Sequence, residues 1–316
     1  MIWSIPRMSE LSRSGKLQRR STPRWRWPAR RRVPIGIVLA LLAVYLIWGS
    51  TYLGIRIALE SFPPFLLAGT RFLLAGSVLY LGLRARGTPV PSRSQWAGGA
   101  LLGTLLLVGG NAGVTFAEQW VTSGLAALGV ATVPLWAALF AGLLGRWPRR
   151  FEWAGLALGF VGIVLLNLEG DMRANPLGAL ILLLAATSWA FGTVWSRRLS
   201  LPEGLMASAV EMLAAGAVLL PISLLAGERM SGPPSTRALL AFVYLVTFGA
   251  LVAFSAYNYL LRRVRPALAT SYAYVNPLVA VALGVGLAGE RIGGSGLLAM
   301  VVILAGVGLV MLGREH

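Results

Sequence analysis

Long runs of mostly apolar residues dominate this sequence and constrain its fold more than any other feature. A helix needs about 20 such residues to cross the hydrocarbon core of a bilayer. Runs of that length fall near residues 34–56, 64–84, 96–117, 122–145, 151–168, 177–197, 204–226, 237–261, 267–289 and 293–313. The connections between them are short. The pattern therefore predicts an all-α membrane protein with ten transmembrane helices.

The composition argues against an enzyme of the soluble type. Hydrophobic residues make up 57% of the 316 positions and charged residues 12%, whereas soluble chains carry about 25% charged residues. Cysteine is absent, and the one histidine is the last residue, His316. These absences remove disulfides, thiolate metal sites and histidine-based catalysis. We therefore expect no enzymatic activity, no metal and no cofactor.

The net charge of +17 makes nucleic-acid binding an alternative to consider. The positions of the basic residues argue against it, because they concentrate in residues 1–33 and in short loops between the apolar runs. Residues 1–33 are rich in arginine and interrupted by proline. We interpret them as a cytoplasmic tail that meets anionic lipid headgroups, and we expect no nucleic-acid partner.

The loop charges predict how the chain is oriented in the membrane. Loops on the cytoplasmic side carry an excess of lysine and arginine. With the N-terminus inside, the outer side collects only Arg173, Arg229, Arg237 and Arg291. The inner side collects the tail and Arg84, Arg86, Arg93, Arg146, Arg149, Arg150, Arg197, Arg198, Arg262, Arg263, Arg265 and Arg314. Both termini are therefore expected in the cytoplasm.

The sequence repeats itself at a spacing of about 140 residues. Residues 71–79 match 211–219, residues 48–51 match 189–192, and residues 131–135 match 274–278. The matches predict two related halves, 34–170 and 171–316. Because five helices are an odd number, the second half enters the membrane from the opposite side. Inverted repeats are typical of transporters, whose substrate site lies near the midplane between the halves.

Two prolines occupy matching places in the fourth and ninth predicted helices. Pro134 and Pro277 each remove a backbone hydrogen bond and free a carbonyl group. We expect a helix break at each that faces the central cavity; a simple packing kink is the alternative.

The same residues resemble the EamA-like permeases of the drug/metabolite transporter superfamily. The resemblance rests on the sequence Ile-Trp-Gly-Ser-Thr-Tyr at 47–52, on Arg71-Phe72 and Ala75-Gly76, and on residues 159–165. Pro134, Pro277, Gly289-Glu290 and Ala305-Gly306 extend it over residues 37–313. Arg146-Trp147 departs from it, since many relatives carry a Gly-Glu pair there. The resemblance implies a ten-helix transporter in the bacterial cytoplasmic membrane, usually an exporter of amino acids, metabolites or drugs.

Trp48 and Trp189 are candidates for the substrate cavity because they hold equivalent places in the first helix of each half. The resemblance supports this, since relatives line their cavity with residues of these two helices. An indole ring offers an amphipathic solute an apolar face and one N–H donor. The alternative is a packing or interfacial tryptophan, as Trp153 is expected to be near a helix end.

Polar side chains within apolar helices form a second group of candidates, which are Asn111, Tyr257, Asn258 and Asn276. In hydrocarbon each needs a hydrogen-bonding partner, so all four should face the interior of the bundle. They bind substrate, or they bond one helix to another.

Arg71 and Glu211 are equivalent residues of opposite charge, each about 10 Å inside its predicted helix. A charge at that depth is costly unless it is paired or hydrated. Glu211 is the candidate proton-coupling carboxylate, since taking up a proton neutralises a buried carboxylate. Arg71 is a candidate for an outer gate or for attracting an anionic substrate group. A fixed ion pair between the two is the alternative.

Secondary export of a small, amphipathic solute by alternating access is the function that these features favour. A membrane-embedded lipid flippase or lipid-modifying enzyme is the alternative. The expected partners are the solute, membrane lipid and a proton as candidate coupling ion. A monomer and a weak homo-oligomer both fit the sequence.

The orientation can be tested cleanly because the chain has no native cysteine. Cysteine at Asn175 should react with an impermeant maleimide in intact cells, whereas cysteine at Arg149 should react only after the cells are opened. Labelling in the reverse order would contradict the orientation and the inversion of the halves.

Overall fold

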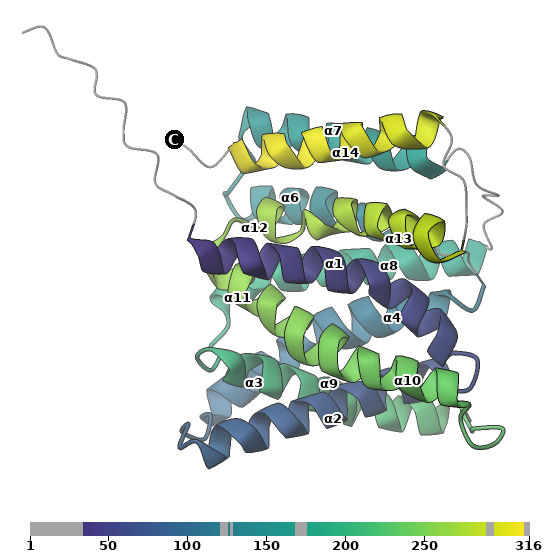
Figure 1. Cartoon of the computed structure of the whole chain (residues 1–316). Coiled ribbons are helices and arrows are strands. Elements are labelled where there is room, and N and C mark those ends of the chain that lie inside the picture. Colours follow the sequence, from purple (N-terminus) through teal and green to yellow (C-terminus); the bar gives the residue numbers. More distant parts are fainter. Residues whose placement is uncertain (1–33, 121–125, 127–128, 168–175, 289–293, 313–316) are drawn as a thin grey trace, which may run out of the picture. The chain divides into compact units, whose positions relative to one another are not determined.

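The computed structural model describes residues 34–120, 126, 129–167, 176–288 and 294–312. Every regular element in these residues is a helix (Figure 1). The predicted tail, Gly289-Glu290, Arg173, Arg291 and Arg314 lie outside the described residues. The predicted all-α fold is thereby confirmed for the described part of the chain.

Six helical segments are long and apolar enough to cross a membrane. Three belong to the first half: α1 (Ile35–Ala58), α2 (Pro64–Ala85), and a segment at Arg93–Ala117 that joins α3 (Arg93–Gly103), η1 (Thr104–Ala112) and α4 (Gly113–Ala117). Three belong to the second half: α8 (Pro176–Trp195) with η2 (Ser196–Arg198), α9 (Leu205–Leu225), and a segment at Thr236–Arg263. That last segment joins α10 (Thr236–Tyr244), η3 (Leu245–Phe254) and α11 (Ser255–Arg263).

The remaining apolar helices lie where the other four crossings are predicted. They are α6 (Val133–Leu143), α7 (Arg150–Asn167), α12 (Pro266–Ala269) with α13 (Tyr272–Ala288), and α14 (Gly294–Leu312). The bounds of α7, of α12 with α13 and of α14 agree with the predicted runs within a few residues. The fourth run was predicted at 122–145, and its described apolar helix covers only Gly129–Leu143. The total of ten crossings stays a prediction.

The third long segment of each half contains a stretch of π-helix, which the sequence analysis did not anticipate. One is η1 and the other is η3. A π-helical turn is rare and is often found at functional sites. The same irregularity therefore occupies corresponding positions in the two halves.

The prolines differ from each other in their effect. Pro134 is the second residue of α6 and follows a turn at Thr132, so the helix is interrupted just before it. The predicted break at Pro277 is wrong, because α13 runs through this residue. A proline removes only one backbone hydrogen bond, and α13 packs against α1, which supports it. The interruption instead precedes α13, at Thr270 and Ser271, whose hydroxyls donate to the carbonyls of Pro266 (2.9 Å) and Leu268 (2.7 Å).

Helix contacts occur in matching sets across the two halves. The second helices pack on each other as α2 and α9, and the fifth as α7 and α14. The first helix of each half packs on the fourth of the other half, giving the pairs α1–α13 and α8–α6. Each first helix also packs on a π-helical segment, α1 on η3 and α8 on η1. In Figure 1, α1 and α8 accordingly lie between α2 and α9 on one side and α7 and α14 on the other.

Glycines let the paired helices approach closely. A methyl group built on Gly76 of α2 would lie 2.8 Å from the backbone nitrogen of Leu213 in α9. One built on Gly216 of α9 would lie 2.8 Å from the backbone nitrogen of Leu73 in α2. The α7–α14 pair shows the same feature, since a methyl on Gly306 would lie 2.7 Å from the nitrogen of Gly159. Small residues of this kind bring helix backbones together in membranes.

Carboxylates add polar links between the halves at both ends of the helices. The Glu228 carboxylate, after α9, accepts from the backbone N–H groups of Phe65 (3.1 Å) and Leu66 (2.8 Å) in the first turn of α2. At the other end, Glu152 of α7 accepts from Arg265, which precedes α12, at 2.7 Å. A carboxylate at a helix N-terminus satisfies free N–H groups and complements the helix dipole.

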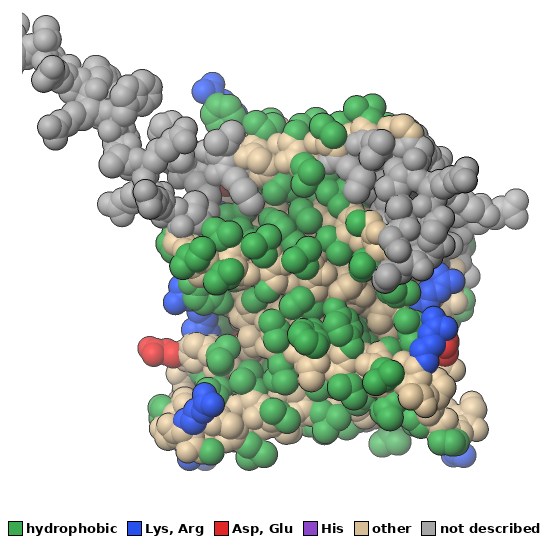
Figure 2. Space-filling model, viewed as in Figure 1, with side chains coloured by type: hydrophobic (Ala, Val, Ile, Leu, Met, Phe, Trp, Pro, Cys, Tyr) green, Lys and Arg blue, Asp and Glu red, His purple; other side chains and the backbone are tan. Residues whose placement is uncertain are grey.

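Apolar side chains cover the outside of these helices. Figure 2 shows them spread over the visible face, with arginines near its ends. On α1 alone, Leu39, Leu42, Leu46 and Leu53 are exposed. A surface of this kind is suited to lipid contact.

The α2–α9 contact predicts different responses from two glycines of α2. Gly76→Ala should lower the melting temperature of the purified protein, because the added methyl group meets backbone atoms of α9. Gly82→Ala is the matched control, since nothing lies within 4 Å of a methyl group there. In a helix interior, alanine is more favourable than glycine by about 1 kcal/mol, so the control should be unchanged or stabilised. Equal melting temperatures for the two variants would contradict close packing at Gly76.

Candidate functional site

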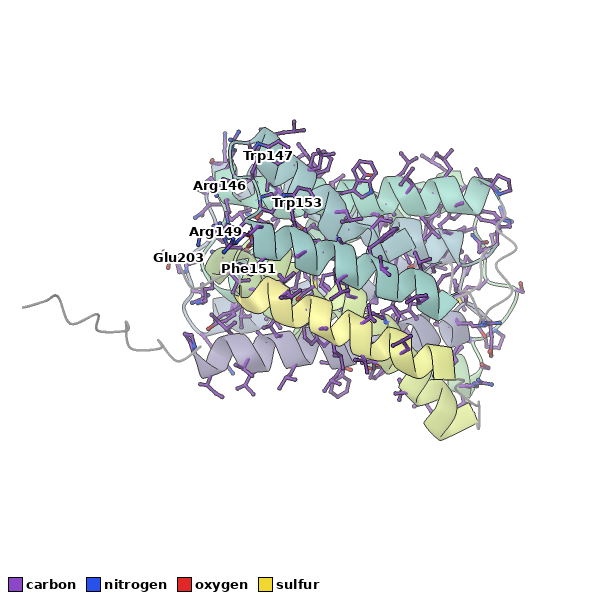
Figure 3. The ribbon with its side chains drawn as sticks, turned by 90° about the horizontal axis from the view of Figure 1, so that it is seen from above. Arg146, Trp147, Arg149, Phe151, Trp153 and Glu203 are labelled. Carbon is purple, nitrogen blue, oxygen red and sulfur yellow. The ribbon has the colours of Figure 1, made fainter. Side chains whose placement is uncertain are left out.

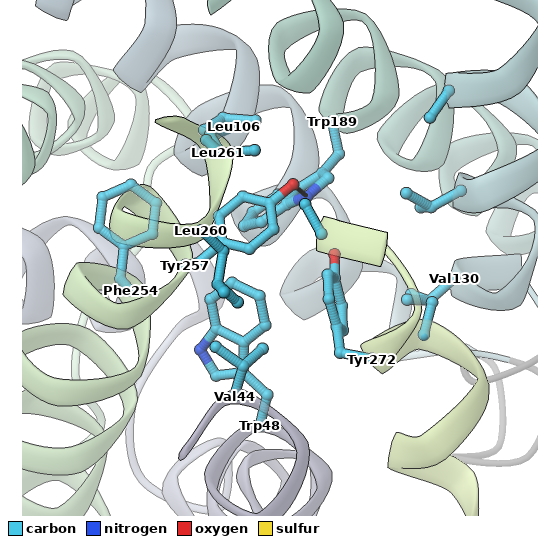
Figure 4. Close-up of a cluster of buried hydrophobic side chains, with 14 of the residues drawn as sticks. Val44, Trp48, Leu106, Val130, Trp189, Phe254, Tyr257, Leu260, Leu261 and Tyr272 are labelled. Atoms are coloured by element: carbon cyan, nitrogen blue, oxygen red, sulfur yellow. Dashed lines mark hydrogen bonds between the residues drawn. The ribbon is translucent and has the colours of Figure 1, made fainter. Parts of the chain in front are cut away.

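Four aromatic side chains from four helices meet in the middle of the bundle (Figure 4). They are Trp48 of α1, Trp189 of α8, Tyr257 of α11 and Tyr272 of α13, and we call them the aromatic cluster. The Trp48 ring lies edge-on to Trp189 at 5.3 Å and to Tyr272 at 4.8 Å between centroids. Tyr257 lies 5.1 Å from Trp48 and 5.3 Å from Trp189. All four side chains are buried.

Hydrogen bonds fix the orientation of these rings. The Trp189 indole N–H donates to the Tyr257 hydroxyl at 2.9 Å, and that hydroxyl lies 2.5 Å from the Thr193 hydroxyl. The Trp48 indole N–H donates to the carbonyl of Gly249 in η3 at 3.2 Å. Both indole N–H groups are thus satisfied, as buried tryptophans require.

A cavity of about 60 Å³ adjoins the aromatic cluster, and we call it the central cavity. Its volume suits a few water molecules or a small part of a solute. Apolar residues form most of its wall, with a few polar groups among them. The lining comprises Trp48, Thr51, Tyr52, Ile55, Gly110, Asn111, Val114, Val130, Val133, Ala185, Ala186, Trp189, Tyr272 and Asn276.

A second and larger cavity, of about 470 Å³, lies at the end of the helices where α6 and α8 finish. We call it the arginine-rich cavity because Arg146, Arg197, Arg198 and Arg265 line it together with Glu152. Figure 3 shows Arg146, Trp147 and Arg149 grouped at this end. The Glu152–Arg265 ion pair lies in its wall.

The two cavities occupy successive stretches of the same helices, and Trp48, Trp189 and Tyr272 of the aromatic cluster lie in the wall of the central one. Along α6, Val133 lines the central cavity, whereas Ala137 and Ala141 line the arginine-rich cavity. Along α8, Trp189 is the last residue of the central lining, and Val194 begins the other. From α12 to α13 the order along the chain is reversed: Ala267 lines the arginine-rich cavity, and the later residue Tyr272 lines the central cavity. The same three helical stretches, α6, α8 and α12 with α13, therefore line both cavities in succession.

Arg71 lies beside the central cavity, in the wall of a smaller hollow that shares Trp48, Thr51, Asn111 and Trp189 with it. Its guanidinium donates to the side-chain oxygen of Asn111 in η1. The side chain is buried, and its Nε has no hydrogen-bond partner among the described residues.

Glu211 occupies the equivalent position in α9 and is fully buried. One of its oxygens accepts from the Asn258 amide of α11 at 2.6 Å, and that amide also donates to Ser208 at 3.0 Å. The other oxygen, Oε1, is buried without a partner among the described residues. Arg71 and Glu211 form no ion pair in the described part of the chain. Each instead bonds to an asparagine on the third long segment of its own half.

Apart from Arg71 and the two prolines, the predicted residues therefore fall into three places. Trp48, Trp189 and Tyr257 meet in the aromatic cluster, while Asn111 and Asn276 line the central cavity. With its N–H₂ group directed at the backbone, Asn276 donates to the carbonyls of Tyr272 (3.0 Å) and Tyr45 (3.3 Å), which links α13 to α1. Asn258 and Glu211 lie apart from the central cavity's lining.

Sequence reasoning missed Tyr272, Tyr52 and Thr193. Tyr272 lies at the very start of α13, next to Thr270 and Ser271, and this cluster of polar residues inside an apolar run was the available signal. The sequence does not predict the arginine-rich cavity, because loop arginines are already explained by the orientation of the chain in the membrane. Among the described residues, no group of three His, Cys, Asp or Glu side chains is placed to hold a metal ion.

Comparison with known proteins agrees with this geometry. The profile of the EamA-like transporter family matches the chain twice, at residues 34–168 and 176–312. A protein named uncharacterized inner membrane transporter YedA, from Escherichia coli K12, is 51% identical over 87% of this chain and 90% of its own length. A probable amino-acid metabolite efflux pump of Salmonella typhimurium is 28% identical over 85% of this chain and 92% of its own length.

A solved structure shares the fold. Titled only "Crystal structure of protein", it is 24% identical and superposes with a TM-score of 0.74 over 88% of this chain and 99% of its own. The two family matches, the inner-membrane relative and the apolar helices agree with one another. The protein is a multi-pass protein of the bacterial inner membrane and belongs to the EamA-like transporter family.

Proposed function

We propose that this protein is a secondary transporter that exports a small amphipathic solute by alternating access. The observation that carries this proposal is the pair of cavities lined in succession by the same helices, with three residues of the aromatic cluster in the wall of the central one. A transporter needs a site that is reached from one side of the membrane at a time. In this proposal the aromatic cluster separates those two accesses.

The architecture supports the proposal through its repeated features. We infer ten transmembrane helices in two inverted halves, because the family profile matches twice and the helix contacts occur in matching sets. The π-helical segments η1 and η3 hold corresponding positions and each packs on a first helix. Rocking of one set of helices against the other would then open the two cavities in turn.

The charges of the loops determine the direction in which we propose that the solute crosses the membrane. The arginine-rich cavity lies at the end that holds Arg146, Arg197 and Arg265, which we assign to the cytoplasm by the excess of positive charge. The central cavity faces the other end, since it includes Tyr52 and Ile55 near the close of α1. A solute would enter through the arginine-rich cavity and leave past the central one.

The relatives favour transport over the alternative of a lipid flippase or lipid-modifying enzyme. Two of the named proteins are a transporter and a probable efflux pump. The chemistry of the central cavity agrees, because its aromatic rings and isolated amide groups suit a solute with an apolar body and a polar end. We therefore infer that the substrate of this chain is a solute with an apolar body and a polar end.

Glu211 is the proposed proton carrier. It is a fully buried carboxylate with one oxygen unpartnered among the described residues. Its partner Asn258 directly follows Tyr257 in α11, and the Tyr257 hydroxyl accepts from Trp189. A change of charge at Glu211 can therefore be transmitted through α11 to the aromatic cluster.

The aromatic cluster predicts the effect of a change at Trp189. In proteoliposomes loaded with candidate solutes, Trp189→Ala should weaken flux or apparent affinity by roughly tenfold, the equivalent of about 1.4 kcal/mol. Trp153→Ala is the matched control, because Trp153 is exposed on α7. Expression and helicity should stay near wild type in both variants. Equal losses of flux would show that α8 does not line the substrate path.

Proton coupling predicts a different phenotype for Glu211→Gln. Wild-type efflux should rise when the proton concentration is higher on the receiving side, because protons moving inward drive the solute outward. Glu211→Gln should bind solute but lose this response, since an amide cannot carry the proton. Glu203→Gln is the control, as Glu203 is an exposed carboxylate just before α9. A Glu211→Gln variant with an unchanged response to pH would exclude Glu211 as the carrier.

A further inference from the structure

Arg71 carries a buried positive charge that is not neutralised by direct contact with any described residue. The side chain is only 3% exposed. Among the described residues its guanidinium makes one hydrogen bond, to the neutral Asn111 amide, and lies over the Phe72 ring at 4.4 Å, while its Nε has no hydrogen-bond partner. A guanidinium has five N–H donors in a planar fork, so most of its bonding capacity is unused.

An uncompensated charge of this kind is costly inside a membrane protein. Charged residues at such depth are normally paired with each other, with backbone carbonyls or with water, and they often mark a substrate pathway. Glu118, in the turn after α4, attracts the Arg71 guanidinium through space but forms no ion pair with it. Glu118 also has a buried oxygen without a hydrogen-bond partner among the described residues. The two opposite charges are held apart rather than joined.

Arg71 lies where its unused N–H donors can reach the proposed solute path. The hollow that it lines also contains Trp48, Thr51, Asn111 and Trp189, and these four residues line the central cavity as well. Trp48 and Trp189 offer apolar ring surfaces at the same place. A solute in the central cavity could therefore meet a cation and two indole rings together.

We propose that Arg71 binds the carboxylate of the transported solute, which is an organic acid with an apolar or aromatic body. This inference rests on the transport function proposed above and names its substrate class. A carboxylate matches the guanidinium fork with two parallel N–H···O bonds, which is the strongest form of this interaction. Its apolar body then contacts Trp48 and Trp189.

The charge of the proposed entrance agrees with this class. Arg146, Arg197 and Arg198 line the arginine-rich cavity, and the carboxylate in its wall, Glu152, is already bonded to Arg265. A cavity lined by one sign of charge raises the local concentration of the opposite ion. Anionic solutes are therefore favoured at the entrance and again beside Arg71.

Matched solutes that share a carbon skeleton and differ in the charge and type of their head group test the proposal. The probes are phenylacetate and indole-3-acetate, their neutral amides, and the amines phenethylamine and tryptamine. Each is added to the purified full-length protein, and the melting temperature is measured, since a ligand of the native state raises it. Both carboxylates should raise the melting temperature, and the amides should bind roughly tenfold to a hundredfold more weakly.

Variants of the site then test whether the preference for carboxylates over amides depends on Arg71. Arg71→Gln should remove the advantage of the carboxylates, and Arg71→Lys should retain part of it, since lysine keeps the charge without the fork. Arg84→Gln, an exposed arginine at the end of the same helix, should leave the preference unchanged. Asn111→Asp should abolish carboxylate binding while the protein stays folded, because it places a permanent carboxylate on Arg71.

Three results would overturn the proposal. They are equal binding of acids and amides, an undiminished preference in Arg71→Gln, and the absence of any carboxylate effect on the melting temperature. Each is separable from a failure of the transport function. If amides or amines bind in a way that requires Trp189 but not Arg71, the cavity is a solute site and only the acidic substrate class is wrong. If no variant of the aromatic cluster alters solute flux, the transport path itself is wrong.

Discussion

The direct approach of helix backbones at glycine residues is the interaction on which the rest of the structure depends. Lipid tails are as apolar as leucine, so helices in a membrane associate through close packing and polar bonds rather than through the hydrophobic effect. Gly76 and Gly216 permit that packing between α2 and α9, and Gly306 permits it between α14 and α7. These two pairs hold the halves together on either side of α1 and α8 (Figure 1). Trp48 and Trp189 meet between these two pairs because α1 and α8 both lie there.

The fold was largely predictable from the sequence, and the reason is physical. A helix in a bilayer must satisfy all its own backbone groups, so a run of apolar residues has one outcome. The predicted run at 204–226 became α9 at Leu205–Leu225, for example. The π-helical segments escaped prediction because they change the hydrogen-bond pattern of the backbone without changing the apolar composition of the run. The break predicted at Pro277 failed for a related reason. A proline removes one backbone hydrogen bond, but the packing of neighbouring helices determines whether the helix is interrupted there.

The site was predictable only where the repeat constrained it. Trp48 and Trp189 hold equivalent positions, so their meeting in the middle follows from the relation between the halves. Tyr272 has no such counterpart in the matches, and its contact with Trp48 depends on the turn before α13. Arg71 and Glu211 also hold equivalent positions, but the repeat does not predict which side chains they bond to. Each bonds to an asparagine of its own half, at different places along the third long segment. The two halves thus share the same arrangement of helices, but they carry opposite charges, Arg71 and Glu211, at one equivalent position.

The pairing of each half with the other has a consequence for how the protein is made. The ribosome delivers α2 and α7 to the membrane before α9 and α14 have been synthesised. Until then, the glycine faces of α2 and α7 have only lipid or a chaperone against them, and the N-terminus of α2 lacks the Glu228 carboxylate that will cap it. The first half is therefore expected to wait in the bilayer as a set of loosely associated helices. Its final packing is completed only after Glu228 and α14 have emerged from the ribosome.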